Sequence, residues 1–102
     1  MQSTPQPTNP YKDSALKISV YDTYVQRPNG LRMHFDILVP SDLSDQAVVL
    51  GYGQTYLASK GLPPSILKSE KCNFCHVESA SATVASEITA KGFSIIEMEH
   101  CH

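Results

Sequence analysis

Two thiols and an imidazole lie within one short stretch of this chain, Cys72-Asn73-Phe74-Cys75-His76. Cys101 lies near the end of the sequence, so all 3 cysteines fall in its last third. Two thiolates at C-x₂-C spacing can bind one tetrahedral ion such as zinc, at about 2.3 Å from each sulfur. The motif therefore predicts half of a zinc site, which needs further ligands from other parts of the chain.

Cys101 is the expected third ligand of this site. The fourth ligand is expected to be one of the histidines His34, His76, His100 and His102. Neighbouring residues of an extended strand point to opposite faces, so His76 can share an ion with Cys75 only through a tight turn. His34 is the more natural ligand if Cys101 lies at a strand end, and the predicted metal set is thus Cys72, Cys75, Cys101, His34 and His76.

Other chemistry is compatible with the same motif. A Cys72/Cys75 pair could act as a thiol-disulfide oxidoreductase, because Lys71 and a following helix would favour the thiolate. The motif nevertheless comes later in the chain than in the thioredoxin pattern. Covalent haem attachment at C-x-x-C-H is disfavoured by the small β-rich domain. The cysteines could also be simple core residues, since free cysteine is often buried.

A second group of side chains is predicted on the outer face of a hairpin. Asp22 and Asp36 are expected to face each other across two strands and, with His34, to form a polar patch. Asp36 could orient the imidazole of His34. The sequence contains no Gly-rich phosphate loop, no G-x-S-x-G and no H-E-x-x-H, which leaves nucleotide binding, serine hydrolase and zincin activities without support.

Hydrophobic periodicity predicts the elements that carry these residues. Apolar and polar residues alternate from Ala15 to Val25 and from Leu31 to Val39, and Arg27-Pro28-Asn29-Gly30 has the composition of a turn. The two segments therefore predict a β-hairpin. Ser41 or Ser44 is expected to cap a helix that reaches about Lys60.

The second half predicts a strand over 66–72, a helix from Ser79 or Ser81 to Lys91, and a central strand over 93–98. The order is ββαβαβ. It indicates an α+β two-layer sandwich with a mixed four-stranded sheet and both helices on one face. Residues 15–102 form one domain, and residues 1–14 are predicted to be a disordered polar leader.

Composition limits the possible partners and the compartment. The chain has 102 residues, 18% charged residues and a net charge of −2. Without basic runs, nucleic-acid binding is not expected. No signal peptide or membrane span is apparent, so a cytoplasmic location with reduced thiols is expected. A domain of this size would gain stability from a metal or from a homodimer interface.

Four motifs resemble a small bacterial domain-of-unknown-function family, number twenty twenty-four in that series. They are VYDTYV at 20–25, MHFD at 33–36, CxFCHxE at 72–78 and IIEMExC at 95–101. The resemblance implies the α+β fold but no established activity. From the residues themselves we expect a zinc-binding module with a structural or regulatory ion, more a binding protein than an enzyme. The alternatives are the Cys72/Cys75 oxidoreductase and a metal-free homodimeric interaction domain.

Overall fold

A long β-hairpin forms the centre of the fold. In the computed structural model, which describes residues 16–102, β1 (Lys17–Gln26) and β2 (Arg32–Pro40) pair from Ile18↔Pro40 to Gln26↔Arg32. The turn between them is closed by a 2.8 Å hydrogen bond from the Arg27 amide to the Leu31 carbonyl. Gly30 has φ +90°, a value that side chains disfavour. The predicted hairpin is confirmed, and the predicted leader lies outside the described residues.

The remaining elements complete a ββαβαβ order, as predicted. They are α1 (Gln46–Ser59), short 3₁₀ turns at Pro64–Ile66 and Ser69–Lys71, β3 (Cys72–Ser79), α2 (Ala82–Lys91) and β4 (Ser94–Glu99). Asp45 caps α1 in place of the predicted serines, and Ser81 caps α2. The strand predicted over 66–72 is wrong. This segment forms the two 3₁₀ turns, and the cysteine motif lies within the strand that follows.

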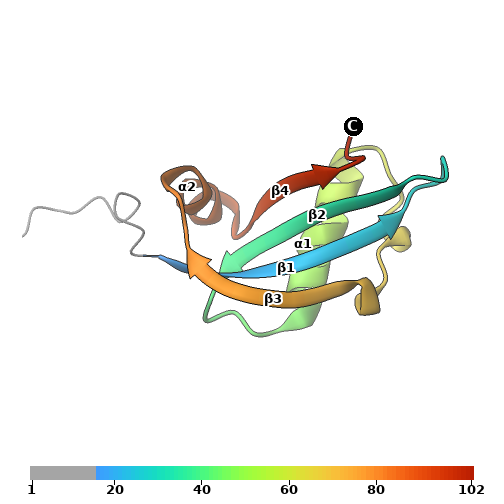
Figure 1. Cartoon of the computed structure of the whole chain (residues 1–102). Coiled ribbons are helices and arrows are strands. Elements are labelled where there is room, and N and C mark those ends of the chain that lie inside the picture. Colours follow the sequence, from blue (N-terminus) through green and yellow to red (C-terminus); the bar gives the residue numbers. More distant parts are fainter. Residues whose placement is uncertain (1–15) are drawn as a thin grey trace, which may run out of the picture.

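The sheet has the order β3-β1-β2-β4 and is antiparallel throughout (Figure 1). The α+β class is confirmed, but the predicted mixed sheet is wrong. The position of the last strand differs too, because among residues 16–102 β4 pairs with β2 alone and lies at an edge. Its outer residues Ile96 and Met98 stay exposed, so its apolar composition does not reflect burial on both sides.

The main core lies between α1 and one face of the sheet. Met33, Phe35 and Ile37 of β2 are fully buried on this face. α1 approaches closely at Gly53, where an added Cβ would lie 2.6 Å from Leu67 Cδ2 and 2.9 Å from Ile37 Cδ1. The glycine thus permits helix and sheet to pack at short distance.

The second helix packs on the opposite face. Val84, Ala85 and Ile88 of α2 form a separate cluster with Ile18, Val20 and Leu38. Since adjacent strand residues point to opposite faces, Leu38 faces away from the core that holds Ile37. The prediction of both helices on one face is therefore wrong. Both faces of the sheet carry apolar residues at this end, and each face is buried by a different helix.

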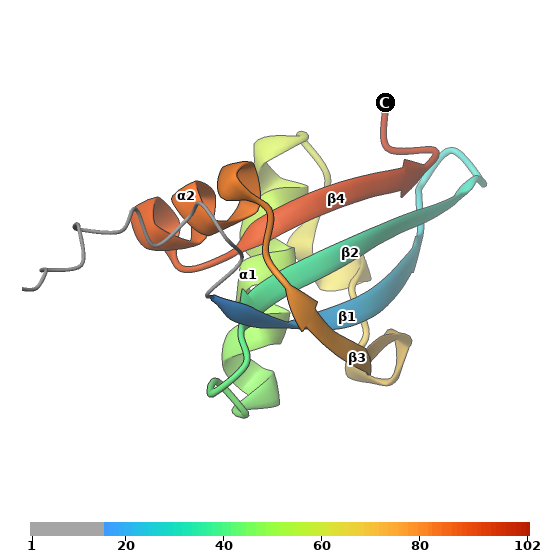
Figure 2. The same ribbon diagram turned by 60° about the vertical axis from the view of Figure 1, so that its left-hand side comes forward.

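α2 lies at one end of the sheet, whereas α1 crosses the other face (Figures 1 and 2). The polar residues Asp22, His34 and Asp36 alternate with the core residues of β1 and β2, so they point away from α1. Among residues 16–102, no helix is long and apolar enough to cross a membrane.

Candidate metal centre

Three ligand-type side chains meet on the face of the hairpin that points away from α1. Asp22 on β1 is directly opposite Asp36 on β2, and His34 is two residues before Asp36 on the same strand. Directly opposed residues of antiparallel strands have Cβ atoms about 5 Å apart. The register of the hairpin therefore places two carboxylates and one imidazole at the same point.

The distances within this cluster suit a shared ion. His34 Nε2 lies 2.5 Å from Asp22 Oδ1 and 3.7 Å from Asp36 Oδ1. One ligand atom of each residue lies within 4.8 Å of those of the other two. The side chains of His34 and Asp36 are only 17% and 19% exposed, whereas that of Asp22 is 40% exposed. The cluster is thus half-buried, and Asp22 lies on its solvent side.

The two carboxylates place an excess of negative charge at this point. Burial, followed by the hydrogen bond and the charge of Asp22, raises the pKa of Asp36 above its ordinary value of 3.8. The positive charges of His34 and His76 oppose this rise. Two neighbouring carboxylates are stabilised either by a shared proton or by a cation. A divalent ion could replace the proton here.

Aromatic packing fixes the orientation of the imidazole. The ring of Tyr24 stacks on that of His34, with centroids 4.2 Å apart and an interplanar angle of 11°. The guanidinium of Arg32 lies 4.7 Å from the centre of the same tyrosine ring. A ring held on one face has fewer rotamers to lose when it binds a ligand. Tyr24 therefore acts as a support for the Nε2 atom of His34.

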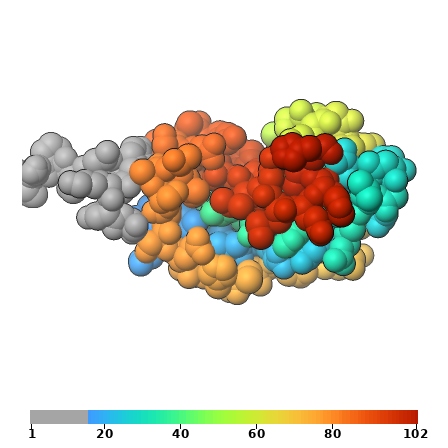
Figure 3. Space-filling model, turned by 45° about the horizontal axis from the view of Figure 1, so that its top comes forward, coloured from blue at the N-terminus to red at the C-terminus, as the bar shows by residue number. Residues whose placement is uncertain are grey.

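The cysteine ligands predicted from the sequence lie far from one another. Cys72 lies at the start of β3 and Cys101 follows β4, and these strands are the two edges of the sheet. Figure 1 shows β3 along one edge of the sheet and β4 along the other, and Figure 3 shows the red C-terminal segment beside the cyan β1–β2 turn. Among the described residues, the group whose ligand atoms converge is Asp22, His34 and Asp36. Of the predicted metal set, only His34 belongs to it.

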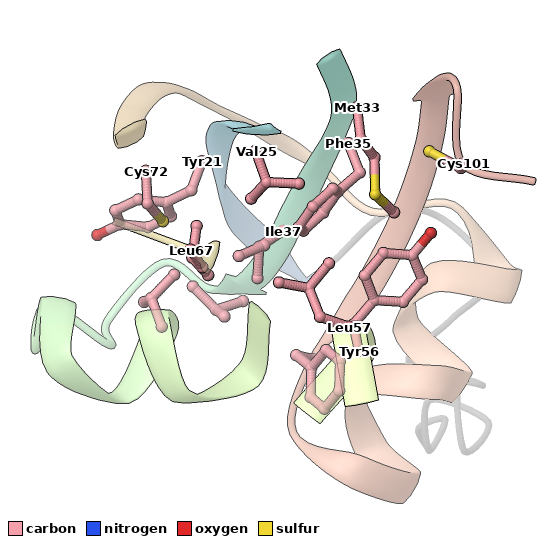
Figure 4. Close-up of a cluster of buried hydrophobic side chains, with 13 residues drawn as sticks. Tyr21, Val25, Met33, Phe35, Ile37, Tyr56, Leu57, Leu67, Cys72 and Cys101 are labelled. Atoms are coloured by element: carbon pink, nitrogen blue, oxygen red, sulfur yellow. The ribbon is translucent and has the colours of Figure 1, made fainter. Parts of the chain in front are cut away.

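Cys72 and Cys101 are core residues. Figure 4 shows them at opposite ends of the buried cluster, with the side chains of Val25, Phe35 and Ile37 between them. Burial raises the pKa of the Cys72 thiol, and Thr23 Oγ1, 3.6 Å from its sulfur, offsets part of this rise. The Cys101 thiol donates to the carbonyl oxygen of His34 at 3.3 Å. Both thiols thus lie in the protein interior.

Cys75 and His76 lie on the exposed edge of β3. Cys75 Sγ is 3.2 Å from His76 Nδ1, and His76 Nε2 is 2.6 Å from Glu78 Oε1. Three residues of extended strand span about 10 Å, which exceeds the Cα separation of about 7 Å that a disulfide tolerates. β3 as formed therefore does not allow Cys72 and Cys75 to bond to each other, and the three cysteines are free thiols.

The sequence already indicated the acidic cluster as a polar patch, but the predicted metal set did not include Asp22 or Asp36. Two signals identify them. The Arg27–Gly30 turn fixes the register of the hairpin, and strict alternation puts both aspartates on the face of His34. Thiolates at C-x₂-C spacing are typical zinc ligands, so the sequence pattern favours the cysteines over these aspartates.

Comparison with known proteins agrees with this architecture. Residues 16–98 match the family described as Domain of unknown function (DUF2024). The chain belongs to this family. A DUF2024 chain is thus expected to share the four-stranded antiparallel sheet described above, and the resemblance noted in the four motifs is confirmed at the level of the family.

A solved structure supports the same fold. The chain is similar to the NMR structure of protein NE1680 from Nitrosomonas europaea, a structural genomics target, with a TM-score of 0.74 and 37% identity. The alignment covers 85% of this chain and 100% of that one. No curated protein matches the sequence. Neither similarity carries an activity, so function has to be argued from the site.

Proposed function

We propose that this DUF2024 protein binds a divalent metal ion at Asp22, His34 and Asp36, and that zinc is the ion that suits these ligands. The observation that carries the proposal is the convergence of three ligand atoms within 4.8 Å of one another on two paired strands. Imidazole nitrogen and carboxylate oxygen are both established zinc ligands. The antiparallel register holds them without any need for a loop to rearrange.

The donor set favours an exchangeable ion over a structural one. Structural zinc sites are closed by four protein ligands, whereas open sites have three and keep a position for water or another molecule. The three residues lie on a sheet face turned away from the α1 core, and Asp22 is the most exposed of them. The protein would therefore bind and release zinc as a folded domain.

The test is zinc titration by calorimetry of the purified protein after removal of metal. We expect one site per chain, and a loss of affinity of at least about tenfold in Asp36→Asn, which removes one charged ligand. Cys75→Ser is the matched control, because this exposed residue belongs to the cysteine site predicted from the sequence. Loss of binding in Cys75→Ser with full binding in Asp36→Asn would reject the aspartate site and support the cysteine site.

A second candidate function is that of an interaction domain acting as a homodimer. Both edge strands expose large apolar side chains, Phe74 and Val77 on β3 and Ile96 and Met98 on β4. Unpaired edge strands readily pair with another chain. Light scattering over a range of concentrations tests this proposal. A monomer mass at all concentrations would reject it, and a dimer that Phe74→Ser dissociates but Met98→Ser does not would assign the interface to β3.

A further inference from the structure

The edge of β3 carries a second cluster of reactive side chains, outside the metal centre. Cys75 Sγ contacts His76 Nδ1 at 3.2 Å, and the other ring nitrogen of His76 contacts Glu78 Oε1 at 2.6 Å. Cysteine is the nucleophile of the three, histidine its base, and the carboxylate the group that orients the base. All three side chains are exposed.

A β-bulge brings these residues together. Val20 pairs with His76 and Tyr21 pairs with Phe74, so Cys75 is an extra residue without a partner on β1. In a regular strand the side chains of neighbouring residues point to opposite faces and would not meet. A bulge changes the direction of the extra side chain. The thiol of Cys75 can therefore reach the imidazole of the next residue.

The carboxylate determines which nitrogen of His76 carries the proton. Ionised Glu78 can only accept hydrogen bonds, so neutral His76 must donate from Nε2–H. Nδ1 is then an acceptor, and it faces the sulfur of Cys75. The geometry places a proton acceptor beside the thiol and a negative charge behind the acceptor, which stabilises the imidazolium formed when the proton moves.

We propose that Cys75 is a site of reversible S-thiolation by low-molecular-weight disulfides. The thiol transfers its proton to Nδ1 of His76, and the thiolate attacks one sulfur of the disulfide. The bond between the two disulfide sulfurs breaks as the bond to Cys75 Sγ forms. The second sulfur leaves as a thiolate and takes a proton from the imidazolium. One free low-molecular-weight thiol is released for each mixed disulfide formed on Cys75.

The surroundings of Cys75 favour this reaction over acyl transfer. Disulfide exchange needs an accessible thiolate and an open line of approach, whereas acyl transfer also needs donors aimed at an oxyanion. Cys75 has an accessible thiol with an open line of approach, because it lies on an open strand edge. The other two thiols, Cys72 and Cys101, are buried and cannot attack the mixed disulfide. The adduct would persist until a thiol from solution removes it.

The test is the reaction of the full chain with glutathione disulfide in the presence of a chelator, followed by intact mass and peptide mapping. We expect one glutathione adduct, located at Cys75, and none in Cys75→Ser. First modification at Cys72 or Cys101 would overturn the proposal. Because the readout is the mapped position of the adduct on the wild-type protein, it does not depend on how any variant folds.

The role of His76 as the proton acceptor is tested by the pH profile of the rate. In His76→Gln we expect the second-order rate constant at neutral pH to fall by about threefold or more, because no group beside the Cys75 thiol then accepts its proton. Glu78→Gln should give a smaller change in the same direction. Glu99→Gln, an exposed residue on the opposite edge strand, is the matched control. Identical pH profiles for His76→Gln and the wild type would overturn the proposed relay.

Discussion

The side chain of His34 belongs both to the metal set predicted from the sequence and to the cluster of converging ligand atoms in the structure. Its Nε2 atom lies 2.5 Å from a carboxylate oxygen of Asp22, and a carboxylate can only accept, so Nε2 carries a proton when no metal is bound. A metal ion bound at Nε2 takes the place of that proton, which moves to Nδ1 of the neutral ring. At lower pH the ion has to displace the proton that the raised pKa of Asp36 retains.

Zinc affinity is therefore expected to fall as the pH is lowered, with protons released on binding. Calorimetric titration in two buffers of different ionisation enthalpy measures the number of protons released. Asp42→Asn, an exposed aspartate outside the cluster, should behave as the wild type. Equal apparent enthalpies in the two buffers at acidic pH would show that binding displaces no proton from Asp36, and would contradict its role as a ligand.

Tyr24 is the residue whose contribution to the site can be separated from ligation. Its ring stacks on the imidazole but offers no ligand atom among the converging three. We expect Tyr24→Leu to keep one site per chain with an affinity lowered by about tenfold, because the imidazole loses its support. Calorimetry measures both the number of sites per chain and the affinity. Loss of the site itself would mean that Tyr24 is required for the hairpin and not only for orientation.

At the scale of elements, α1 is attached to the sheet through two different contacts. One is the close packing at Gly53, against Leu67 and Ile37. The other is polar and joins the end of the helix to β4, where Tyr56 Oη donates to Glu97 Oε2 at 2.5 Å and Lys60 Nζ lies 2.7 Å from the same oxygen.

Two glycines of α1 allow a matched test of the first contact. Gly51→Ala meets nothing within 4 Å, so it should stabilise the protein by about 1 kcal/mol through helix propensity. Gly53→Ala places a methyl group against buried side chains, and this overpacking should make it less stable than Gly51→Ala by about 2 kcal/mol. Urea denaturation of both variants measures the difference. Equal free energies of unfolding for the two variants would show that the close packing of α1 at Gly53 does not oppose an added methyl group.

The polar contact predicts a dependence on pH. Hydrogen bonds from Lys60, then from Tyr56, lower the pKa of Glu97 below its ordinary value of 4.5. A carboxylate with a lowered pKa in the folded state stabilises that state above its unfolded pKa, and the contribution is lost as the pH falls through the folded pKa. Glu97→Gln should therefore approach the stability of the wild type as the pH falls from the ordinary value of 4.5 through the lowered pKa of Glu97. If the difference in free energy of unfolding between the wild type and Glu97→Gln stayed constant over this pH range, the proposed contribution of the contact would be contradicted.

Tyr56→Phe tests the same contact from the helix. Removal of one hydroxyl that donates to a charged acceptor should lower the free energy of unfolding by about 1.5 kcal/mol near neutral pH. Tyr52→Phe on the same helix is the control, since its ring stacks on Phe93 in either variant. Denaturant titration compares the two, and equal losses would show that the Glu97 hydrogen bond makes no specific contribution.

For the whole molecule, the metal should affect stability by mass action and not by completing the fold. The core between α1 and the sheet does not include the metal ligands. We expect the chelated protein to stay folded. Zinc at about one hundred times its dissociation constant should raise the free energy of unfolding by about 2.7 kcal/mol. Thermal unfolding with and without zinc measures this change, and unfolding on chelation would instead indicate a structural ion.

The C-terminal segment shows how the whole fold positions residues that are distant in sequence. Arg27 Nη1 in the hairpin turn donates to the carbonyl oxygens of His100 and His102 at 2.8 Å and 3.0 Å. His100 adopts φ +55°, and the chain then places Cys101 in the core. The end of the chain thus returns to the β1–β2 turn, as the red and cyan surfaces in Figure 3 show, and not to β3.

Local sequence determined the hairpin and, through it, the positions of the three candidate ligands. The Pro28-Asn29-Gly30 turn sets the register, and the period of two along β1 and β2 places Asp22, His34 and Asp36 on one face. The serine cap and the glycine stop of α2 were equally local signals. These features depend on residues close together in the chain, so the sequence by itself predicted the hairpin, the polar patch and the ends of α2, but it did not predict Asp22 and Asp36 as ligands.

Only the tertiary structure decided where the cysteines lie. The order of strands in a sheet depends on long-range packing, and here the connection through α2 takes the chain from one edge to the other, which separates Cys72 from Cys101. The bulge at Cys75 likewise arises from pairing with β1, and no periodicity in the motif reveals it. A C-x₂-C spacing forms a zinc knuckle where the backbone turns, and in this fold the same residues lie in a bulged edge strand.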